Sequence, residues 1–404
     1  MKLAHVLSLI VLLSTMALIS NAADWPQWRG PDQNGISKET GWSAKWPAEG
    51  PKQLWKAQVG VGYSSFSVSN GRVYTTGNNK DTETIFCFDA NTGAILWKHS
   101  FDSKLDAKYY DGGTSATPTV DDGKVFAISK RGLVQCLDAA KGTILWSKNI
   151  ADELKAEVPT WGFAGSITIV GETALLNVGS AGTALEKKTG KVLWTSGTDV
   201  SGYSTPVLCD VNGERAAMLM TKQDGVAVKV ADGKELWRVA WKTSYDVNAA
   251  DPILSGGKVF ISSGYNRSGG LFDVTVSPPK EIWQNKNMRN HFNPCVLLGG
   301  NLYGIDDDAT RPNAALRCVD LLTGGIKWTE KTGFGSVISA DGKLIVLTAK
   351  GELMVAEASP AGFKPISRAQ VLGGKCWTAP VLANGKIYCR NATGQVVCLD
   401  VSGK

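Results

Sequence analysis

A spaced motif of acidic residue, glycine and tryptophan recurs along the chain and limits its fold more than any other feature. Glycine follows the acidic residue after four positions and tryptophan follows after eight. Full copies occur at Asp89, Gly93 and Trp97, at Asp138, Gly142 and Trp146, and at Asp320, Gly324 and Trp328. The tryptophan strand itself recurs more widely, at intervals of 43 to 49 residues, and each of its tryptophans follows a pair that contains at least one apolar residue. These tryptophans are Trp97, Trp146, Trp194, Trp237, Trp283 and Trp328. This period is typical of four-stranded propeller blades, which bury their apolar faces by stacking on one another.

Each part of the motif has a physical role in a tight turn between two strands. An aspartate carboxylate can accept hydrogen bonds from the amides of its turn, and glycine adopts the positive φ that other residues avoid. Tryptophan combines a large apolar body with an N–H group that needs a partner. We therefore expect Asp89 to cap its own turn and Trp97 to pack between neighbouring sheets.

The segments between the motifs alternate apolar and polar residues and are separated by short turns rich in Gly and Asn. This pattern predicts strands throughout the repeats and no helix. Seven complete units follow one another along the chain, the first beginning near residue 64. An eighth unit begins at Lys375 but ends after its third strand. We predict an all-β fold, an eight-bladed β-propeller built of four-stranded antiparallel blades.

The eighth unit lacks a tryptophan strand, and residues 51–60 supply one. Their sequence, PKQLWKAQVG, is that of a fourth strand, but no strand pair precedes it. When the two ends are joined inside a turn, eight positions separate Asp400 from Trp55, as in the motif. The sequence therefore predicts that this N-terminal strand completes the C-terminal blade, which closes the ring and removes open sheet edges.

Residues 1–22 have the features of a Sec-type signal peptide: Lys2, an apolar run and small residues before the expected cleavage site. The first cysteine is Cys87, so the cysteine of a lipoprotein signal is missing. We expect three segments: the signal peptide, an N-terminal extension at 23–50 and a single propeller at 51–404. We expect a periplasmic or secreted protein without a transmembrane segment after signal cleavage, because no other apolar stretch is long enough.

Eight cysteines in an exported chain raise the question of disulfides. Four of them share one repeat position, close to the acidic residue of the motif: Cys87, Cys136, Cys318 and Cys398. Equivalent positions in different blades lie too far apart for a disulfide, so we expect these four to be buried, small apolar residues. The sequence leaves the disulfide state of the other four open: Cys209, Cys295, Cys376 and Cys389.

Charge and histidine content argue against several function classes. The net charge of +6 is spread along the chain without a Lys/Arg block, so we expect no nucleic-acid partner. Beyond the expected signal peptide only His99 and His291 remain, which disfavours a histidine metal cluster and Ser-His-Asp catalysis. No calcium-ligand spacing follows the acidic residues at 306–308, which we interpret as a solvated loop. We predict no metal site, and the sequence does not identify a catalytic residue.

Loop lengths predict which face of the propeller binds. The turns after the first and third strands of each unit are short, whereas loops after the second and fourth strands are long and variable. The long loops lie at 101–113, 151–163, 242–251, 263–270 and 304–313. Binding sites concentrate in such loops on a rigid scaffold. We therefore expect a protein or glycan partner on this face and a monomeric protein.

The first strand of each blade is expected to line the central channel. Positions three before a proline of these strands are Ser115, Tyr203, His291 and Trp377, with Tyr63 and Phe163 at equivalent places in units without proline. Positions one before the proline are Thr117, Thr205, Asp251 and Asn293. An aromatic ring above a polar ring suits a flat or sugar-like ligand. Our candidate binding residues are Tyr63, Tyr203, Asp251, His291, Asn293 and Trp377.

The repeats resemble the propeller repeat of the pyrroloquinoline-quinone (PQQ)-like family. The resemblance is carried by the motif blocks at 89–97, 138–146 and 320–328, with variants at 186–194 and 229–237, and it covers residues 51–404. The family includes quinoprotein alcohol dehydrogenases and non-catalytic scaffolds such as BamB. It therefore implies the propeller fold more strongly than any single function.

The resemblance implies two alternative functions. Quinoprotein dehydrogenases carry two adjacent cysteines beside the quinone, and no two cysteines are adjacent here. The first expectation is therefore an exported, non-catalytic, BamB-like binding or scaffold protein. The alternative is a PQQ-dependent alcohol dehydrogenase-like enzyme with the quinone and Ca²⁺ in the central channel. The sequence itself assigns no cofactor.

Overall fold

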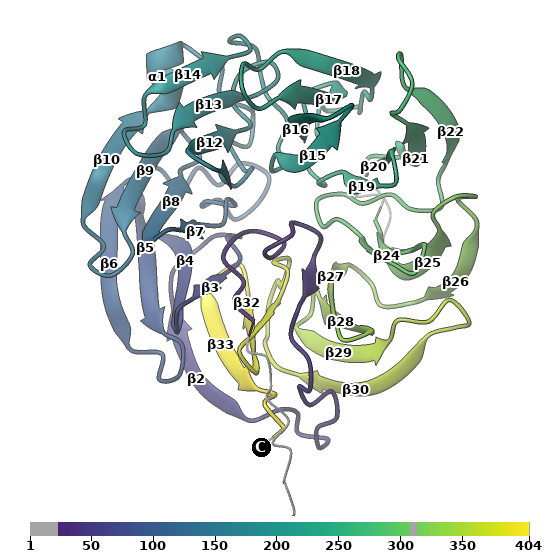
Figure 1. Cartoon of the computed structure of the whole chain (residues 1–404). Coiled ribbons are helices and arrows are strands. Elements are labelled where there is room, and N and C mark those ends of the chain that lie inside the picture. Colours follow the sequence, from purple (N-terminus) through teal and green to yellow (C-terminus); the bar gives the residue numbers. More distant parts are fainter. Residues whose placement is uncertain (1–22, 308–312, 404) are drawn as a thin grey trace, which may run out of the picture.

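The computed structural model describes residues 23–307 and 313–403. In this part of the chain, thirty-three strands and one short helix form an eight-bladed β-propeller (Figure 1). The blades are four-stranded and antiparallel, and the first strand of each lies nearest the central axis. The predicted fold class is confirmed. None of the described residues forms a helix with the length and apolar character needed to cross a membrane.

The strand bounds follow the repeat. Blades 1 and 2 contain β3 (Ser67–Ser69), β4 (Arg72–Asn79), β5 (Thr82–Asp89), β6 (Ile95–Asp102), β7 (Thr119–Asp121), β8 (Lys124–Ile128), β9 (Leu133–Asp138) and β10 (Ile144–Asn149). Blades 3 and 4 contain β11 (Thr168–Val170), β12 (Thr173–Leu176), β13 (Thr183–Glu186), β14 (Val192–Thr195), β15 (Val207–Val211), β16 (Glu214–Met220), β17 (Asp224–Lys229) and β18 (Glu235–Ala240). Blades 5 and 6 contain β19 (Ile253–Ser255), β20 (Lys258–Ser263), β21 (Ser268–Asp273), β22 (Lys280–Asn285), β23 (Val296–Leu298), β24 (Asn301–Asp306), β25 (Ala315–Asp320) and β26 (Ile326–Glu330). Blades 7 and 8 contain β27 (Gly335–Ala340), β28 (Lys343–Thr348), β29 (Glu352–Glu357), β30 (Lys364–Gln370), β31 (Val381–Ala383), β32 (Lys386–Arg390), β33 (Gln395–Asp400) and β2 (Gln53–Gln58).

The ring closes where the sequence predicts. Strand β2, from the N-terminal part of the chain, pairs antiparallel with β33 and completes blade 8 (Figure 1). Trp55 lies opposite Cys398, which is the same pairing as Trp97 opposite Cys87 in blade 1. The closing pair therefore reproduces the register of an ordinary blade.

The motif also joins each blade to the next. Asp89 accepts hydrogen bonds from the backbone amides of Asn91 and Thr92, and Gly93 has φ of 71°. The indole of Trp55 from blade 8 lies directly on this turn, so a Cβ at Gly93 would sit 2.6 Å from it. The same contact joins Gly142 to Trp97 and three further pairs: Gly190 with Trp146, Gly233 with Trp194, and Gly324 with Trp283. The glycine is therefore required both by the turn and by the tryptophan of the preceding blade.

Most of these tryptophans use their N–H group across the blade boundary. The indole Nε1–H of Trp55 donates to the Ala90 carbonyl (3.2 Å), and that of Trp97 donates to the Ala139 carbonyl (3.0 Å). Trp146, Trp194, Trp283 and Trp328 donate to the following blade in the same way. Trp237 differs, because its buried N–H has no hydrogen-bond partner among the described residues. The expected packing of tryptophan between neighbouring sheets is confirmed.

Residues 24–39 cross the centre of the ring, a feature that the sequence did not predict (Figure 1). We call this segment the N-terminal plug. It includes β1 (Ile36–Ser37), which pairs parallel with β27 of blade 7. It enters from the face opposite the long loops, because Glu39 accepts hydrogen bonds from the amides of Asn384 and Gly385 in the first turn of blade 8.

The plug forms a hydrogen bond with the inner strand region of every blade. In the order of blades 1 to 8, the bonds are Trp25 N to Val68 O (2.9 Å), Val120 N to Pro26 O (2.7 Å), Gln33 Nε2 to Thr168 Oγ1 (2.9 Å), Leu208 N to Gln33 Oε1 (3.1 Å), Trp28 Nε1 to Asp251 Oδ2 (2.6 Å), Arg29 Nη2 to Cys295 O (2.8 Å), Ser339 N to Gly35 O (2.9 Å) and Ser37 Oγ to Leu382 O (2.9 Å). One short segment therefore fills the central channel and fastens all eight blades together.

Two expectations about local structure were wrong. Helix α1 (Ile150–Leu154) follows β10, because the side chain of Asn149 accepts hydrogen bonds from the first amides of the helix. Asp306 is buried at the end of β24 and pairs with Arg289 and Arg317, at 2.7 and 2.9 Å, instead of lying in a solvated loop. Asp307 is also buried, and residue 308 lies outside the described residues.

The cysteines follow the expectation for the repeat. All eight are free, and the four that share the repeat position are fully buried among apolar side chains. Of the other four, only Cys209 is partly exposed. Burial raises the pKa of the Cys136 and Cys398 thiols to about 12, so both remain protonated and behave as small apolar groups.

Candidate binding site

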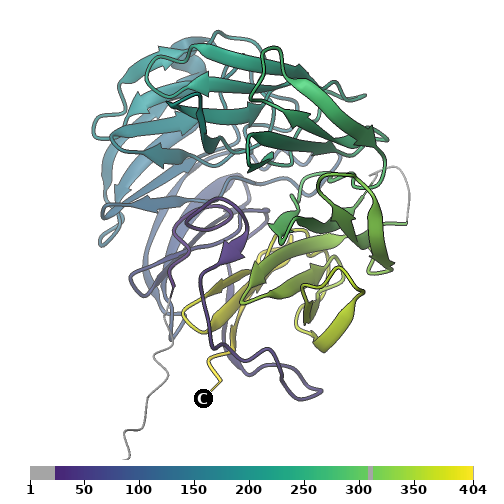
Figure 2. The same cartoon turned by 45° about the vertical axis from the view of Figure 1, so that its right-hand side comes forward.

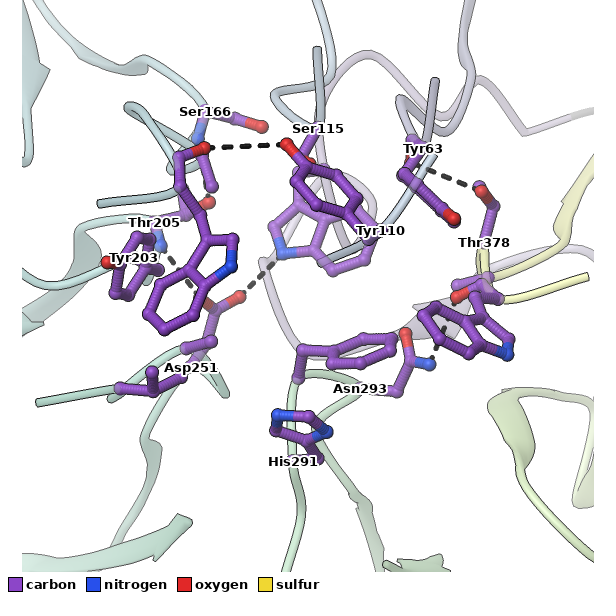
Figure 3. A pocket seen from close by; sticks show the side chains of 18 of the residues that line it. Tyr63, Tyr110, Ser115, Ser166, Tyr203, Thr205, Asp251, His291, Asn293 and Thr378 are labelled. Atoms are coloured by element: carbon purple, nitrogen blue, oxygen red, sulfur yellow. Dashed lines mark hydrogen bonds between the residues drawn. The ribbon is translucent and has the colours of Figure 1, made fainter. Parts of the chain in front are cut away.

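A cavity of about 310 Å³ lies at the end of the central axis on the face that carries the long loops (Figure 3). Of its twenty lining residues, nine are Trp, Tyr or Phe, although these make up only 8% of the chain. We call it the aromatic cup. Its volume falls within the range of small-molecule sites. Figure 2 shows the loops and blades of the same propeller from a second direction.

All six candidate residues line this one cavity: Tyr63, Tyr203, Asp251, His291, Asn293 and Trp377. Ser115 and Thr205, from the same two rings of positions, line it as well. Phe163, expected at the level of the aromatic ring, is instead buried in the core of blades 2 and 3. The cup therefore unites residues from first strands far apart in the sequence. That these residues bind a ligand remains a prediction.

One wall of the cup is held together by a carboxylate from the 101–113 loop. The Tyr63 ring stacks on Trp377, with centroids 5.8 Å apart and planes 27° apart. The Tyr63 hydroxyl donates to the carboxylate of Asp111, which also binds Lys375 Nζ at 2.5 Å. Although partial desolvation acts to raise it, hydrogen bonds from Lys375 and Tyr63 lower the pKa of Asp111 overall. The acid and the lysine therefore neutralise each other at this wall.

Loop side chains complete the wall of the cup. On the side opposite Tyr63, Trp161 from the 151–163 loop meets the edge of the Tyr203 ring at 5.9 Å between centroids. Tyr110 from the 101–113 loop lies between the two sides, because its ring is 5.7 Å from the Tyr63 ring and its hydroxyl donates to the Trp161 carbonyl at 3.5 Å. Burial raises the pKa of Tyr203 to about 12 and also raises the pKa of Tyr110. Both phenols therefore stay protonated and can donate hydrogen bonds. Figure 3 shows Tyr203 and Tyr63 on opposite sides of the cavity.

The floor of the cup is made by the plug. Trp28 lines the cavity and donates its indole N–H to Asp251 Oδ2 at 2.6 Å. Figure 3 shows the position of Asp251 in the cavity. The other oxygen of Asp251 accepts the backbone N–H of Thr205 at 2.8 Å. Burial raises the pKa of Asp251 to about 6, and the positive charge of Arg29 opposes this shift. The plug thus closes the channel beneath the cup, and both oxygens of the Asp251 carboxylate accept hydrogen bonds from the protein.

Arg29 supports this floor from within the plug. It is buried and donates to the carbonyls of Gln33, Asn34 and Cys295 at 2.8 to 3.2 Å. Burial lowers the pKa of Arg29, and the nearby charge of Asp251 opposes that shift. The N–H groups of its guanidinium are therefore engaged by backbone carbonyls, and its charge interacts favourably with that of Asp251.

His291 is placed among aromatic rings and not in an organised acid–base pair. Its Nδ1 lies 3.6 Å from the nearest carboxylate oxygen of Asp307, which is beyond normal hydrogen-bond length. The ring of Tyr265 meets it edge-on at 4.7 Å, and Phe292 lies at 4.8 Å. These contacts favour a packing role for His291 in the wall of the cup.

Sequence reasoning missed four of the most prominent lining residues: Trp28, Tyr110, Trp161 and Tyr265. Trp28 lies outside the repeats, so no alignment of units could place it. Tyr110 and Trp161 lie on long loops whose course depends on tertiary contacts. Tyr265 lies in the short turn between β20 and β21, where the sequence had predicted a long loop at 263–270. The only feature of the sequence that pointed to these residues is that the variable loops are rich in aromatic side chains, which is typical of binding surfaces.

The residues of the cup do not fit PQQ with Ca²⁺. Among residues 23–307 and 313–403, no three His, Cys, Asp or Glu side chains converge on a common point that could hold a metal ion. Asp251 has both oxygens engaged, and Lys375 is bound to Asp111. Of the described residues, no Lys or Arg lines the cavity to bind the carboxylates of a quinone, and we derive no step through this cofactor.

Comparison with known proteins identifies related sequences and folds. The family model described as "Outer membrane protein assembly factor BamB" matches residues 39–194 and 81–330. BamB from Moraxella catarrhalis has 14% identity and a TM-score of 0.63, covering 87% of this chain and 99% of that chain. A quinohemoprotein alcohol dehydrogenase from Comamonas testosteroni has 14% identity and a TM-score of 0.69, covering 94% and 81%. No curated protein sequence matches the chain significantly.

A europium-containing methanol dehydrogenase is similar to the same degree. Its identity is 14% and its TM-score 0.69, with coverage of 91% of this chain and 89% of that chain. At such low identity, the solved structures share the fold with this chain, and their activities do not carry over. The residues of the aromatic cup, and not the shared fold, therefore indicate the function of this chain.

Proposed function

Because the chain belongs to the PQQ-like propeller family described as outer membrane protein assembly factor BamB, we propose that it is an exported, non-catalytic binding propeller. Its partner, a protein or a glycan, enters the aromatic cup on the loop face. The observation that carries this proposal is the cup itself, a cavity lined by nine aromatic side chains and closed at its floor by Trp28 and Asp251. Export rests on the expected signal peptide at residues 1–22.

The chemistry of the cup supports binding over catalysis. General acid–base catalysis needs a titratable group within hydrogen-bond reach of the reacting atoms. Asp251 already accepts two hydrogen bonds from the protein, and His291 is held among rings. Rigid aromatic walls, by contrast, offer a large contact area at low cost in conformational entropy.

The rim of the cup supports contact with a macromolecule. Tyr109 lines the cup and is 83% exposed, and Tyr245 on the 242–251 loop is 62% exposed. Exposed aromatic residues near the centre of a surface often dominate the energy of an interface. They extend the aromatic surface beyond the cavity, so that a partner larger than the cup can be held.

The proposal is tested by screening the chain without residues 1–22 against a displayed peptide library and a glycan array. We expect a binder whose signal falls at least tenfold in the cup variant Trp161→Ala. The matched control is Leu145→Ala, on the outer strand of blade 2, where the side chain is 51% exposed; its binding should be unchanged. Equal binding by both variants would contradict the site assignment.

The alternative function has a direct test. Purified protein is dialysed against tens of micromolar PQQ with Ca²⁺, and its spectrum is compared with that of free quinone. We expect no retained quinone and no alcohol-dependent dye reduction. Retention with dye reduction would replace the binding function with a dehydrogenase.

A further inference from the structure

We propose that the ligand of the aromatic cup is a neutral saccharide, whose ring lies between the Trp161–Tyr203 wall and the Tyr63–Trp377 wall. This inference rests on the proposed function and names the chemical class of its ligand. Three features of the cup carry it: the charges at its rim, the charges at its floor and the hydroxyl groups beneath the rings.

The rim already carries its own cations. Lys375 Nζ lies 4.6 Å from the centroid of the Trp377 ring, Lys130 lies 4.9 Å from Tyr110 and Lys108 lies 5.6 Å from Tyr109. An aromatic cage for a cationic ligand needs ring faces that are free to receive the positive charge. Lysines already lie over three of these rings, so those ring faces are not free to receive the charge of a cationic ligand.

An anionic ligand is disfavoured for the complementary reason. Lys375 is paired with Asp111, and Lys130 lies 3.8 Å from a carboxylate oxygen of Asp106. The remaining cation near the floor, Arg29, is engaged by carbonyls and faces the charge of Asp251. At Lys375, Lys130 or Arg29 a carboxylate or phosphate would have to compete with an existing acid, and Lys108 beside Tyr109 does not line the cavity. The cup therefore favours a ligand without charge.

The neutral ligand must also be polar on one side. Ser166 Oγ accepts the backbone N–H of Thr117, and Thr205 Oγ1 accepts that of Ser166, each at 2.9 to 3.0 Å. Within the described residues, no hydrogen bond uses the O–H of either residue as donor. Covering such a group with an apolar surface removes its hydrogen bonds to water without replacing them, which is unfavourable. A purely hydrocarbon ligand would have this effect at both residues.

A saccharide ring satisfies both demands at once. Its faces present C–H groups to the electron-rich faces of aromatic rings, and its edge presents hydroxyl groups that both donate and accept hydrogen bonds. The phenol of Tyr203 stays protonated and adds a further hydrogen-bonding group at the wall, whereas the Tyr110 hydroxyl already donates to the Trp161 carbonyl. Charge, shape and hydrogen bonding therefore point to the same class of ligand.

The test uses a printed array of neutral, acidic and aminated glycans, followed by calorimetric titration of the strongest neutral binder. We expect binding to neutral glycans with less than a twofold change in affinity between 50 and 500 mM NaCl, because no ion pair forms. Trp161→Ala should weaken binding at least tenfold, and Trp161→Phe should restore part of it. Leu145→Ala is the matched control.

The outcomes separate this inference from the proposed function. Cup-dependent binding of peptides, acidic glycans or trimethylammonium compounds, without neutral glycans, would overturn the saccharide assignment and leave a binding propeller. Neutral-glycan binding that survives Trp161→Ala would overturn the site. An absence of binding on both the array and the peptide library would overturn both proposals.

Discussion

The glycine of the repeat motif meets two constraints at one residue. Gly142 has φ of 71°, and a Cβ there would lie 2.5 Å from the indole of Trp97 in the preceding blade. Gly123 has nearly the same φ, 70°, but a Cβ there would have open space. The two residues therefore separate backbone strain from contact between blades.

We predict that Gly142→Ala destabilises the protein more than Gly123→Ala does. Gly123→Ala bears only the cost of a left-handed conformation, about 1–2 kcal/mol. Gly142→Ala adds a clash with a buried indole, and overpacking of this kind costs about 1–3 kcal/mol more. Urea denaturation measures both losses. Equal losses would show that the tryptophan of one blade does not depend on the glycine of the next.

Glu83 is a buried acid next to the 101–113 loop. Its side chain accepts a hydrogen bond from Ser103 Oγ at 3.0 Å, and only 2% of the residue is exposed. Burial raises its pKa to about 7, against the opposing effects of Thr114, Ser103 and Lys130. The Glu83 carboxyl group therefore binds its proton more tightly in the folded protein than in the unfolded chain.

The sign of the resulting pH dependence follows from linkage. Below pH 4.5 Glu83 is protonated in both states, and its contribution to stability is complete; that contribution is lost as pH rises towards 7. We predict that Glu83→Gln flattens the fall of unfolding free energy between pH 4.5 and 7. The fall will not vanish, because Asp251 titrates in the same window. Denaturation at several pH values measures it, and an unchanged slope would contradict the assignment.

The plug is the element that turns a channel into a cup. Its residues contact all eight blades, and Trp28 provides the floor of the cavity. Arg29 supplies N–H donors to the carbonyls of Asn34 and Cys295, and its charge balances that of Asp251. Arg29 is therefore the buried charged side chain through which the plug is joined to blade 6.

We predict that Arg29→Met destabilises the protein by about 3–5 kcal/mol, because removing one partner leaves a buried acid and several carbonyls uncompensated. The matched control is Lys38→Met in the same segment, whose pair with Asp32 is exposed; it should cost less than about 1 kcal/mol. Chemical denaturation compares the two variants. Similar stability of both would show that the plug is not fastened through Arg29.

The elements were predictable to different degrees. The strands and the closing strand β2 follow from a repeat with fixed spacing, so Trp55 could be placed by counting from Asp400. The first-strand positions of the cup followed from the same counting. The plug has no counterpart in the repeats, and the inward course of Trp161 depends on how its loop packs. Both needed the three-dimensional structure.

At the scale of the whole molecule, the closing seam carries a contact of its own. Arg390 on β32 of blade 8 is fully buried and donates to the carbonyls of Ser64 and Thr76 in blade 1, at 2.9 and 2.7 Å. Burial lowers its pKa to about 9. Together with Trp55, it joins the first and last blades. A closed and plugged ring holds the walls of the cup in place before any ligand arrives, which lowers the entropic cost of binding.

The central claim, that the cup on the loop face binds the ligand, is tested most directly by hydrogen–deuterium exchange of the whole protein. Exchange is measured with and without a saturating amount of the strongest neutral glycan from the array. We predict slower exchange in the loops at 101–113, 151–163 and 242–251, with no change in the motif turns at 89–93 and 138–142 on the opposite face. Protection in those turns, or none in the three loops, would contradict the account.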